Sequence, residues 1–262
     1  MGILNTTPDS FSDGGWFYDA AAAIDQGLRL VAHGADILDI GGESTRPYSV
    51  PVDAEEELRR VMPALSALGA RIDVPISIDT SKAAVAREAL AAGAEIINDV
   101  SGLVRDPEML ALAVESGAGV CVMHMLGTPQ TMQDDPQYED VVEEVIDELR
   151  ARRDALVAAG IPQQRIALDP GIGFGKKTSH NLQLLCNARR LHELGCPVLI
   201  GHSRKGYIGR VIGDDQADRT AGTIGTALAM ACQGVQILRV HDVAPVRQAL
   251  MLFEASGGLS PD

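Results

Sequence analysis

Eight short segments rich in β-branched and aliphatic residues recur along the 262-residue chain, with helical stretches between them. The expected strands are 1–5, 36–42, 75–80, 96–101, 119–125, 165–170, 197–203 and 235–241. Amphipathic runs rich in Ala and Leu, such as 53–69, 82–92 and 138–159, separate several of them. Regular alternation of strand and helix indicates a parallel sheet. Eight such units in about 250 residues favour an α/β fold closed into a single (β/α)8 TIM barrel over an open, doubly wound sheet.

The composition agrees with a single packed domain. Hydrophobic residues make up 46% of the chain and aromatic residues only 3%, and small aliphatic side chains suit helices packed around a buried parallel sheet. No Pro- and Ser-rich linker divides the sequence, so we expect one domain over 1–262. Because Met1–Asn5 already has the pattern of a buried strand, we also expect a short segment to be missing before it.

Charge and cysteine usage narrow the class of protein. A net charge of −14 repels phosphate backbones, which argues against a nucleic-acid partner. No apolar stretch reaches a membrane-spanning length, and no signal peptide is visible. The four cysteines form no CxxC pair, and Cys121 and Cys232 lie in apolar runs. We therefore expect reduced core thiols and a cytoplasmic protein.

A polar group follows every expected strand, at the end of the barrel where active sites of this fold lie. Each group alone has a plain structural explanation. Asp79 can cap the next helix, Lys205 can be a solvated surface lysine, and Asp39 can form a hydrogen bond inside the barrel. His124, between two methionines, is more typical of a core or supporting residue than of a catalyst. Eight polar strand ends on one rim favour a functional site.

Strand alternation groups these residues further. Residues two apart on a strand share a face, so Arg239 points with His241, and Ser203 with Lys205. Together with Arg46 they predict a positive pocket near the last two strands, which in an acidic chain indicates an anionic, phosphorylated substrate. Asp79, Asn98 and Asp169 offer acceptors and an amide to a flat heterocycle rich in donors. The two longest loops, 6–19 and 43–52, are expected to be functional.

At these residues the sequence resembles the dihydropteroate synthases along nearly all of its length. Eight stretches match motifs of that family in order: MGILNTTPDSFSDGG (1–15), DIGGESTRP (39–47), ISIDTSK (76–82), IINDVSG (96–102), VMHMLGTPQTMQ (122–133), LDPGIGFGK (168–176), GHSRKGYIG (201–209) and RVHDV (239–243). The resemblance implies condensation of 6-hydroxymethyl-7,8-dihydropterin diphosphate with 4-aminobenzoate, which gives 7,8-dihydropteroate and pyrophosphate in folate biosynthesis. It also implies sulfonamide inhibition, a Mg²⁺ cofactor and a homodimer formed through outer helices near strands 7 and 8. The small, apolar stretch 209–234 fits either such an interface or a buried helix.

The resemblance implies a role for each matching residue. The residues implied to bind the pterin are Asp79, Asn98, Val100, Met123, Asp169 and Lys205. The residues implied to bind the diphosphate are Thr45, Arg46, Arg239 and His241. Asn5 is implied to contact Mg²⁺. The 4-aminobenzoate pocket is formed by Phe11, Pro47, Phe174, Ser203 and Lys205. Of these, Lys205, Arg239, His241 and Asp79 are expected to be catalytic.

Three other interpretations were compared with this one. A pterin-binding methyltransferase domain shares the barrel and the pterin pocket, but has no use for the ESTRP and SRK segments at 43–47 and 203–205. A catalytically silent paralogue is disfavoured by the complete set of charged rim residues. A phosphate-binding aldolase, with Lys205 as a Schiff base, is disfavoured by the Ser-Arg-Lys context and by the lack of a paired glycine loop.

Overall fold

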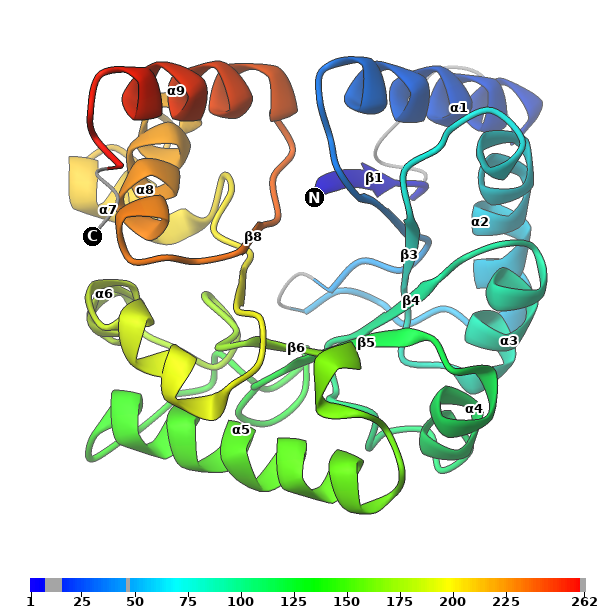
Figure 1. The fold of residues 1–262 in the computed structure, drawn as a ribbon, viewed down its shortest axis with the longest axis horizontal. Helices are drawn as coiled ribbons and strands as arrows, with labels where there is room; N and C mark the ends of the chain where they lie inside the picture. The colour runs from blue at the N-terminus through cyan, green and yellow to red at the C-terminus, as the bar shows by residue number, and fades with distance from the viewer. Residues whose placement is uncertain (8–15, 46–47, 260–262) are drawn as a thin grey trace.

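Eight parallel strands alternate with helices in the computed structural model, which describes residues 1–7, 16–45 and 48–259, apart from the side chains of 16–19. The helices form an outer ring around the strands (Figure 1). The strands are β1 Gly2–Asn5, β2 Leu38–Gly41, β3 Ile76–Asp79, β4 Ile96–Asp99, β5 Gly119–Met123, β6 Ile166–Asp169, β7 Leu199–Ile200 and β8 Ile237–Leu238. The α-helices are α1 Trp16–Ala32, α2 Ala54–Gly69, α3 Ala83–Ala91, α4 Met109–Ser116, α5 Val141–Ala158, α6 Thr178–Cys186, α7 Gly206–Ile212, α8 Thr220–Cys232 and α9 Val243–Ala255, with short 3₁₀ turns at Gln163–Arg165 and Ala188–Leu194.

The strands close into a ring. Strands β1 to β6 pair in sequence order, β7 pairs with β8, and all of these pairs are parallel. Parallel bridges between Leu168 and Val198 and between Gly2 and Val240 join the two ladders at both seams. The predicted (β/α)8 barrel is thereby confirmed, and each strand lies within its expected range.

Local sequence explains where the helices begin. Asp53 caps α2 by accepting a hydrogen bond from the Glu56 backbone N–H at 2.8 Å. Asp140 caps α5 in the same way through the N–H groups of Val142 and Glu143. Acidic residues in both first turns complement the helix dipole. The helices expected over 53–69, 82–92 and 138–159 correspond to α2, α3 and α5.

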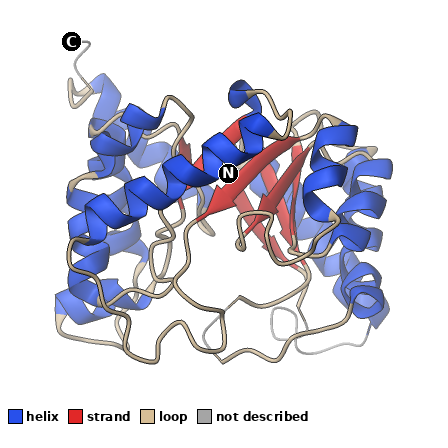
Figure 2. Cartoon of the chain, turned by 90° about the horizontal axis from the view of Figure 1, so that it is seen from below, coloured by secondary structure: helices blue, strands red, loops and turns tan. Residues whose placement is uncertain are grey.

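The core lies between the strands and the surrounding helices, which flank the sheet in the side view (Figure 2). One cluster packs β4–β7 against α4, α5 and α6, and includes Val122, Ile146 and Leu168. The other packs β1–β3 against α1, α2 and α9, and includes Ile40 and Leu65. Each fully buried aliphatic side chain contributes about 1.5–3 kcal/mol, so this packing fixes the rim on which the polar residues stand.

Two expectations were wrong. Helix α1 already begins at Trp16, so the loop predicted over 6–19 ends before that residue. Trp16, Phe17 and Tyr18, which the prediction placed in the loop, are the first residues of this Ala-rich helix. The four cysteines are unpaired, but only Cys121 and Cys196 are buried. Cys186 and Cys232 are the last residues of α6 and α8 and are exposed, because the apolar runs that precede them end at the helix terminus. Within the described residues, no helix is both long and apolar enough to cross a membrane.

Candidate active site

Carboxylates from β2 and β3 converge on Arg239, which directly follows β8. Its Nε donates a hydrogen bond to Asp39 Oδ2 and its Nη2 donates one to Asp79 Oδ2, each at 2.7 Å. Asp39, fully buried on β2, also faces Asn98 Nδ2 at 3.3 Å from both carboxylate oxygens. Residues that are as much as 200 positions apart in the chain therefore form one hydrogen-bonded network.

This network holds two carboxylates beside one guanidinium group. Burial raises the pKa of Asp79 to about 7, with Arg239 opposing this effect and Asp39 adding to it. The pKa of Arg239 is raised because the two carboxylates outweigh its burial, so it stays protonated. The protonation state of Asp79 near neutral pH therefore depends on what binds beside it.

Asp169 and Lys205 meet next to this network, at Gly201 after β7. A Cβ added to Gly201 would lie 3.7 Å from Asp169 Oδ2 and 4.0 Å from both Lys205 Nζ and Arg239 Cδ. Burial lowers the pKa of Lys205 to about 8, with Asp169 opposing it, and burial raises the pKa of Asp169. Gly201 thus leaves space at the point where a carboxylate and two cations approach each other.

The loop between β6 and α6 supplies the aromatic side of the site. Lys205 Nζ donates a hydrogen bond to the carbonyl oxygen of Ile172 and lies 4.6 Å from the centre of the Phe174 ring. A lysine ammonium over an aromatic face is stabilised by the ring quadrupole. The same side chain therefore contacts both the polar rim and the aromatic wall.

A serine and a histidine form a second pair on the β7–β8 side. His241 Nδ1 is 3.1 Å from Ser203 Oγ, and the His241 backbone N–H donates to the same oxygen at 3.2 Å. Ser203 is buried and His241 is partly exposed. This contact orients the imidazole ring beside Arg239.

A cavity of ≈ 290 Å³ opens between the β2–α2 loop and the loops after β3, β4 and β5. Thr45, Asp79 and Val100 line it, together with hydroxyl groups of neighbouring Ser and Thr residues. The cavity is therefore lined both by Thr45, which is assigned to diphosphate binding, and by Asp79 and Val100, which are assigned to pterin binding.

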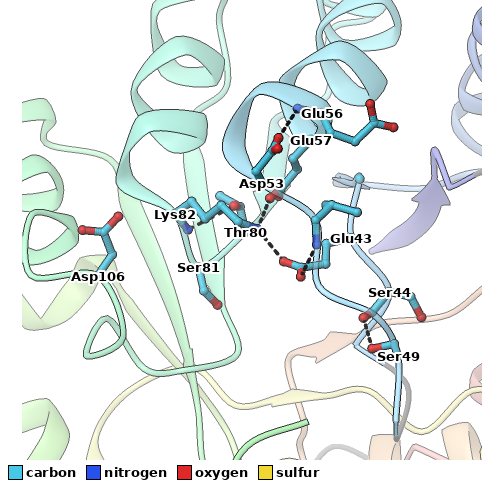
Figure 3. Close-up of polar contacts among 12 residues, drawn as sticks. Glu43, Ser44, Ser49, Asp53, Glu56, Glu57, Thr80, Ser81, Lys82 and Asp106 are labelled. Carbon is cyan, nitrogen blue, oxygen red and sulfur yellow. Dashed lines mark hydrogen bonds and ion pairs between the residues drawn. The ribbon is translucent and has the colours of Figure 1, made fainter. Parts of the chain in front are cut away.

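An ion cluster anchors the β2–α2 loop beside this cavity (Figure 3). Lys82 Nζ lies 2.6 Å from Glu43 Oε2 in the loop and 2.6 Å from Glu57 Oε2 on α2. Glu57 is fully buried, and Arg60 donates to the carbonyl oxygen of Gly42 at 2.9 Å. The start of the loop is therefore fixed immediately before Ser44 and Thr45.

Most of the site residues predicted from the sequence lie together. Asp79, Asn98 and Arg239 belong to one hydrogen-bonded network, and Asp169 and Lys205 approach Arg239 at Gly201. Val100 and Met123 are buried, and Val100 lines the cavity. Asn5 ends β1, two strands from Asp79 in the same register. Phe11, Arg46 and Pro47 lie outside the described residues.

One aspect of the predicted geometry was wrong. Lys205, Arg239 and His241 do not form a simple positive pocket, because Arg239 is paired with two carboxylates and Lys205 approaches Asp169. Strand alternation gives the side on which a residue points, but it does not reveal which residues of distant strands face it. The charge pattern at the centre of the rim is mixed.

The expected hydrogen bond of Asp39 inside the barrel is confirmed, but its partners Arg239 and Asn98 were not predicted. Two supporting lysines were not predicted either. Lys82 and Lys176 are positions inside matched motifs, but a lysine in a loop is ordinarily expected to be solvated. The one available signal was that both lysines lie in segments that follow strands ending in proposed site residues, Asp79 of β3 and Asp169 of β6.

A closed (β/α)8 barrel with carboxylates, an amide and buried cations at the carboxyl ends of its strands belongs to a class of enzymes that act on small molecules. Residues 1–241 match the family model described as pterin binding enzyme. The chain belongs to this family and, within it, to the dihydropteroate synthases.

Three relatives place it there. The Escherichia coli dihydropteroate synthase is 44% identical, with the match covering 98% of this chain and 90% of that protein. The crystal structure of the Yersinia pestis dihydropteroate synthase with a sulfonamide drug complex has a TM-score of 0.92 and 44% identity, covering 98% of this chain and 94% of that one. The Haloferax volcanii "Probable bifunctional folylpolyglutamate synthase/dihydropteroate synthase" is 50% identical over 93% of this chain, which spans 29% of that longer protein.

Proposed function

We propose that the chain condenses 6-hydroxymethyl-7,8-dihydropterin diphosphate with 4-aminobenzoate, releasing pyrophosphate and forming 7,8-dihydropteroate. The observation that carries this proposal is the convergence of Asp169, Lys205 and Arg239 beside Gly201. These groups match the donors of a pterin ring and the negative charge of its leaving group. Membership in the dihydropteroate synthases supports the same reaction.

Asp169 is the residue best suited to hold the aminopyrimidine edge of the pterin. Its Oδ1 accepts a hydrogen bond from the Gly171 backbone N–H at 2.7 Å, which fixes the carboxylate and leaves Oδ2 on the side of Gly201. Asn98 and Asp79 add an amide and a carboxyl group from neighbouring strands. Val100 and Met123 supply the apolar contacts to the ring faces.

Arg239, His241, Thr45 and Arg46 would hold the diphosphate. Arg239 is partly exposed at the rim, so one face of its guanidinium group remains available beside the aspartates. Among the described residues, no group of three or more His, Cys, Asp or Glu side chains offers a complete metal cage. Mg²⁺ commonly takes few protein ligands and several substrate oxygens, so Asn5 at the end of β1 fits as the protein contact. When bound, Mg²⁺ supplies positive charge that stabilises the departing oxygens.

The arylamine substrate would lie between Phe174, Ser203 and Lys205, with Phe11 and Pro47 from the two long loops completing the pocket. The Phe174 ring and the Lys205 ammonium group are already in contact, which provides an aromatic wall and a cation for the carboxylate of 4-aminobenzoate. This arrangement also suits the sulfonamide drugs, which resemble the arylamine.

The bond changes need no covalent enzyme intermediate. The methylene carbon of the pterin loses its bond to the diphosphate oxygen and gains one to the amine nitrogen, which then releases a proton. A neutral arylamine is nucleophilic as it stands, so we assign no general base. Asp79, Lys205, Arg239 and His241 contribute by positioning the reactants and stabilising charge.

Pyrophosphate release that depends on both substrates tests the proposal. Adding the pterin diphosphate alone or 4-aminobenzoate alone should give no release. His241→Ala should weaken binding of the diphosphate substrate, while free pterin binds nearly as before. Arg239→Ala should weaken binding of both, because it also leaves Asp79 without its guanidinium partner. Activity that persists in excess EDTA would contradict the role given to Asn5 and Mg²⁺.

We also propose that residues 1–262 work as one domain in a cytoplasmic homodimer. Exposed apolar side chains on α7 and α9, namely Val211, Ile212, Met251 and Leu252, support an interface near strands β7 and β8. Unpaired cysteines agree with a reducing compartment. Sedimentation of the purified protein, compared with a variant carrying Ile212→Glu and Leu252→Glu, tests the interface.

A further inference from the structure

A second lysine of the β6–α6 loop is buried outside the proposed chemistry. Lys176 is only 2% exposed, whereas the adjacent Lys177 is exposed and pairs with Asp135 at 2.8 Å. A buried lysine is costly unless its ammonium protons are accepted. Lys176 Nζ lies 2.9 Å from the carbonyl oxygen of Phe174, 2.9 Å from His124 Nδ1 and 3.5 Å from the carbonyl oxygen of His124.

His124 connects this lysine to the outer helix layer. Because Lys176 donates to Nδ1, the proton of the neutral imidazole lies on Nε2, which is 3.3 Å from Glu148 Oε2 on α5. The 3.3 Å approach of Nε2 to Glu148 is a polar contact that falls short of a well-formed hydrogen bond. The lysine is thereby linked through β5 to α5.

The loop that carries Phe174 is held almost entirely through its main chain. Five successive carbonyl oxygens, from residues 171 to 175, accept hydrogen bonds, and the donors are Phe174 N, Lys205 Nζ, Gln133 Nε2, Lys176 Nζ and Tyr138 Oη. A Cβ at Gly171 would lie 2.0 Å from the carbonyl oxygen of His124, so the loop also touches the β5–α5 loop directly. Lys176 is the donor that fixes the carbonyl of Phe174 itself.

We propose that Lys176 is a positioning residue for the arylamine substrate. Its ammonium group donates a hydrogen bond to the carbonyl oxygen of Phe174 and another to His124, which directly follows β5. These bonds fix the Phe174 backbone, so that the Phe174 ring remains in contact with Lys205. Lys176 itself contacts the loop, not the reacting atoms. This inference rests on the proposed function, because it assigns a role within the 4-aminobenzoate pocket.

Steady-state kinetics with each substrate varied in turn test the role. Lys176→Met keeps the length of the side chain but removes its donors, and it should raise the KM for 4-aminobenzoate by about tenfold or more. The KM for the pterin diphosphate should change by less than about twofold, since its main contacts lie on the strands. Lys177→Met, the matched control on the same loop, should leave both constants unchanged. Lys176→Arg, which keeps a cationic donor, should restore much of the loss.

A double-mutant cycle separates positioning from general destabilisation. In a Phe174→Leu background, Lys176→Met should raise the KM for 4-aminobenzoate little further, because both changes remove the same ring contact. Full additivity, or an equal rise of both KM values for Lys176→Met, would overturn the inference. If Lys176→Met does not fold, Lys176→Gln, which removes the ammonium group and shortens the side chain, replaces it in the wild-type and the Phe174→Leu backgrounds, with Lys177→Gln as the control; the KM for 4-aminobenzoate should again rise selectively and without additivity. Absence of two-substrate pyrophosphate release by the unaltered enzyme would instead overturn the proposed function.

Discussion

Arg239 and Asp39 form an ion pair at 2.7 Å across the barrel, and Asp79 shares the same guanidinium group. Because Asp39 adds to the burial that raises the pKa of Asp79 to about 7, removing its charge should act on Asp79. We expect Asp39→Asn to lower the pKa of Asp79. Carboxyl ¹³C NMR titration of the ligand-free protein measures this, with Asp36→Asn on the surface as the control. An unchanged titration midpoint for Asp79 would contradict the shared-charge description.

Lys82 should matter for stability more than its partial exposure suggests. Lys82→Met leaves Glu57 buried without its cation, and breaking a buried ion pair costs about 3–5 kcal/mol. Arg87→Met on the same helix removes an exposed pair with Glu108 at 3.8 Å and should cost less than about 1 kcal/mol. Urea unfolding compares the two, and equal effects would show that the Glu43–Lys82–Glu57 cluster does not hold the loop.

Asp169→Asn should weaken pterin binding at least about tenfold with little loss of fold. The substitution keeps the shape but exchanges one acceptor oxygen for a donor, and a mismatched buried hydrogen bond costs about 1–3 kcal/mol. Calorimetric titration with a pterin measures the affinity, and circular dichroism checks the fold. Unchanged pterin affinity in a folded variant would remove Asp169 from the site.

Lys176 should make the protein more stable as the solution becomes alkaline. Burial, partly opposed by Asp169 and Glu148 and aided by Lys205, lowers its pKa to about 7 from an ordinary 10.5. Between these values the unfolded chain holds a proton that the folded protein has released, so the free energy of unfolding rises with pH and the gain is absent below pH 7. Lys205 contributes in the same direction. We expect Lys176→Met to lose about 3 kcal/mol of this rise. Urea unfolding at pH 6.5 and 9.5 checks it, and an unaltered pH dependence would refute the burial effect.

A sulfonamide should bind more tightly when pyrophosphate and Mg²⁺ are present. In the proposed site, Thr45 and Arg46 hold the anion and Pro47 of the same loop completes the arylamine pocket. Because Lys82 fixes the start of this loop, we expect a bound anion to order that pocket. Isothermal titration with and without pyrophosphate measures the difference, which we expect to be about tenfold or more. Equal affinity under both conditions would exclude this coupling, and inhibition that is not competitive with 4-aminobenzoate would exclude a shared pocket.

The periodicity of the sequence was enough to predict the barrel, because strands buried on both faces and capped helices leave local signals such as Asp53 and the apolar run at 119–123. The rim was also predictable, since the fold places every strand end on one side. The pairs that side chains from different strands form with one another could not be predicted. That Arg239 pairs with Asp39 depends on the shear of a closed sheet, which juxtaposes residues 200 positions apart and leaves no local pattern.

The buried lysines were unpredictable for a different reason. Lys176 and Lys177 are neighbours of identical type, yet one is enclosed and the other is solvated. The difference arises from where His124 and the carbonyl of Phe174 lie, and both are set by tertiary packing. For the same reason Asp79 was assigned to ligand binding without its contact to Arg239 being foreseen.

The loop held through its carbonyl oxygens has a consequence for drug resistance. Main-chain oxygens are present whatever the side chain, so the hydrogen bonds accepted by the carbonyl oxygens of Ile172 and Phe174 survive substitution at these two positions. A side chain at Gly171 or Gly175 would instead clash with the β5–α5 loop. An inhibitor that relies on the Phe174 ring can therefore lose its contact by a single mutation that leaves the enzyme folded. An inhibitor that displaces Lys205 and donates a hydrogen bond to the carbonyl oxygen of Ile172 would contact an atom that no point mutation at position 172 removes.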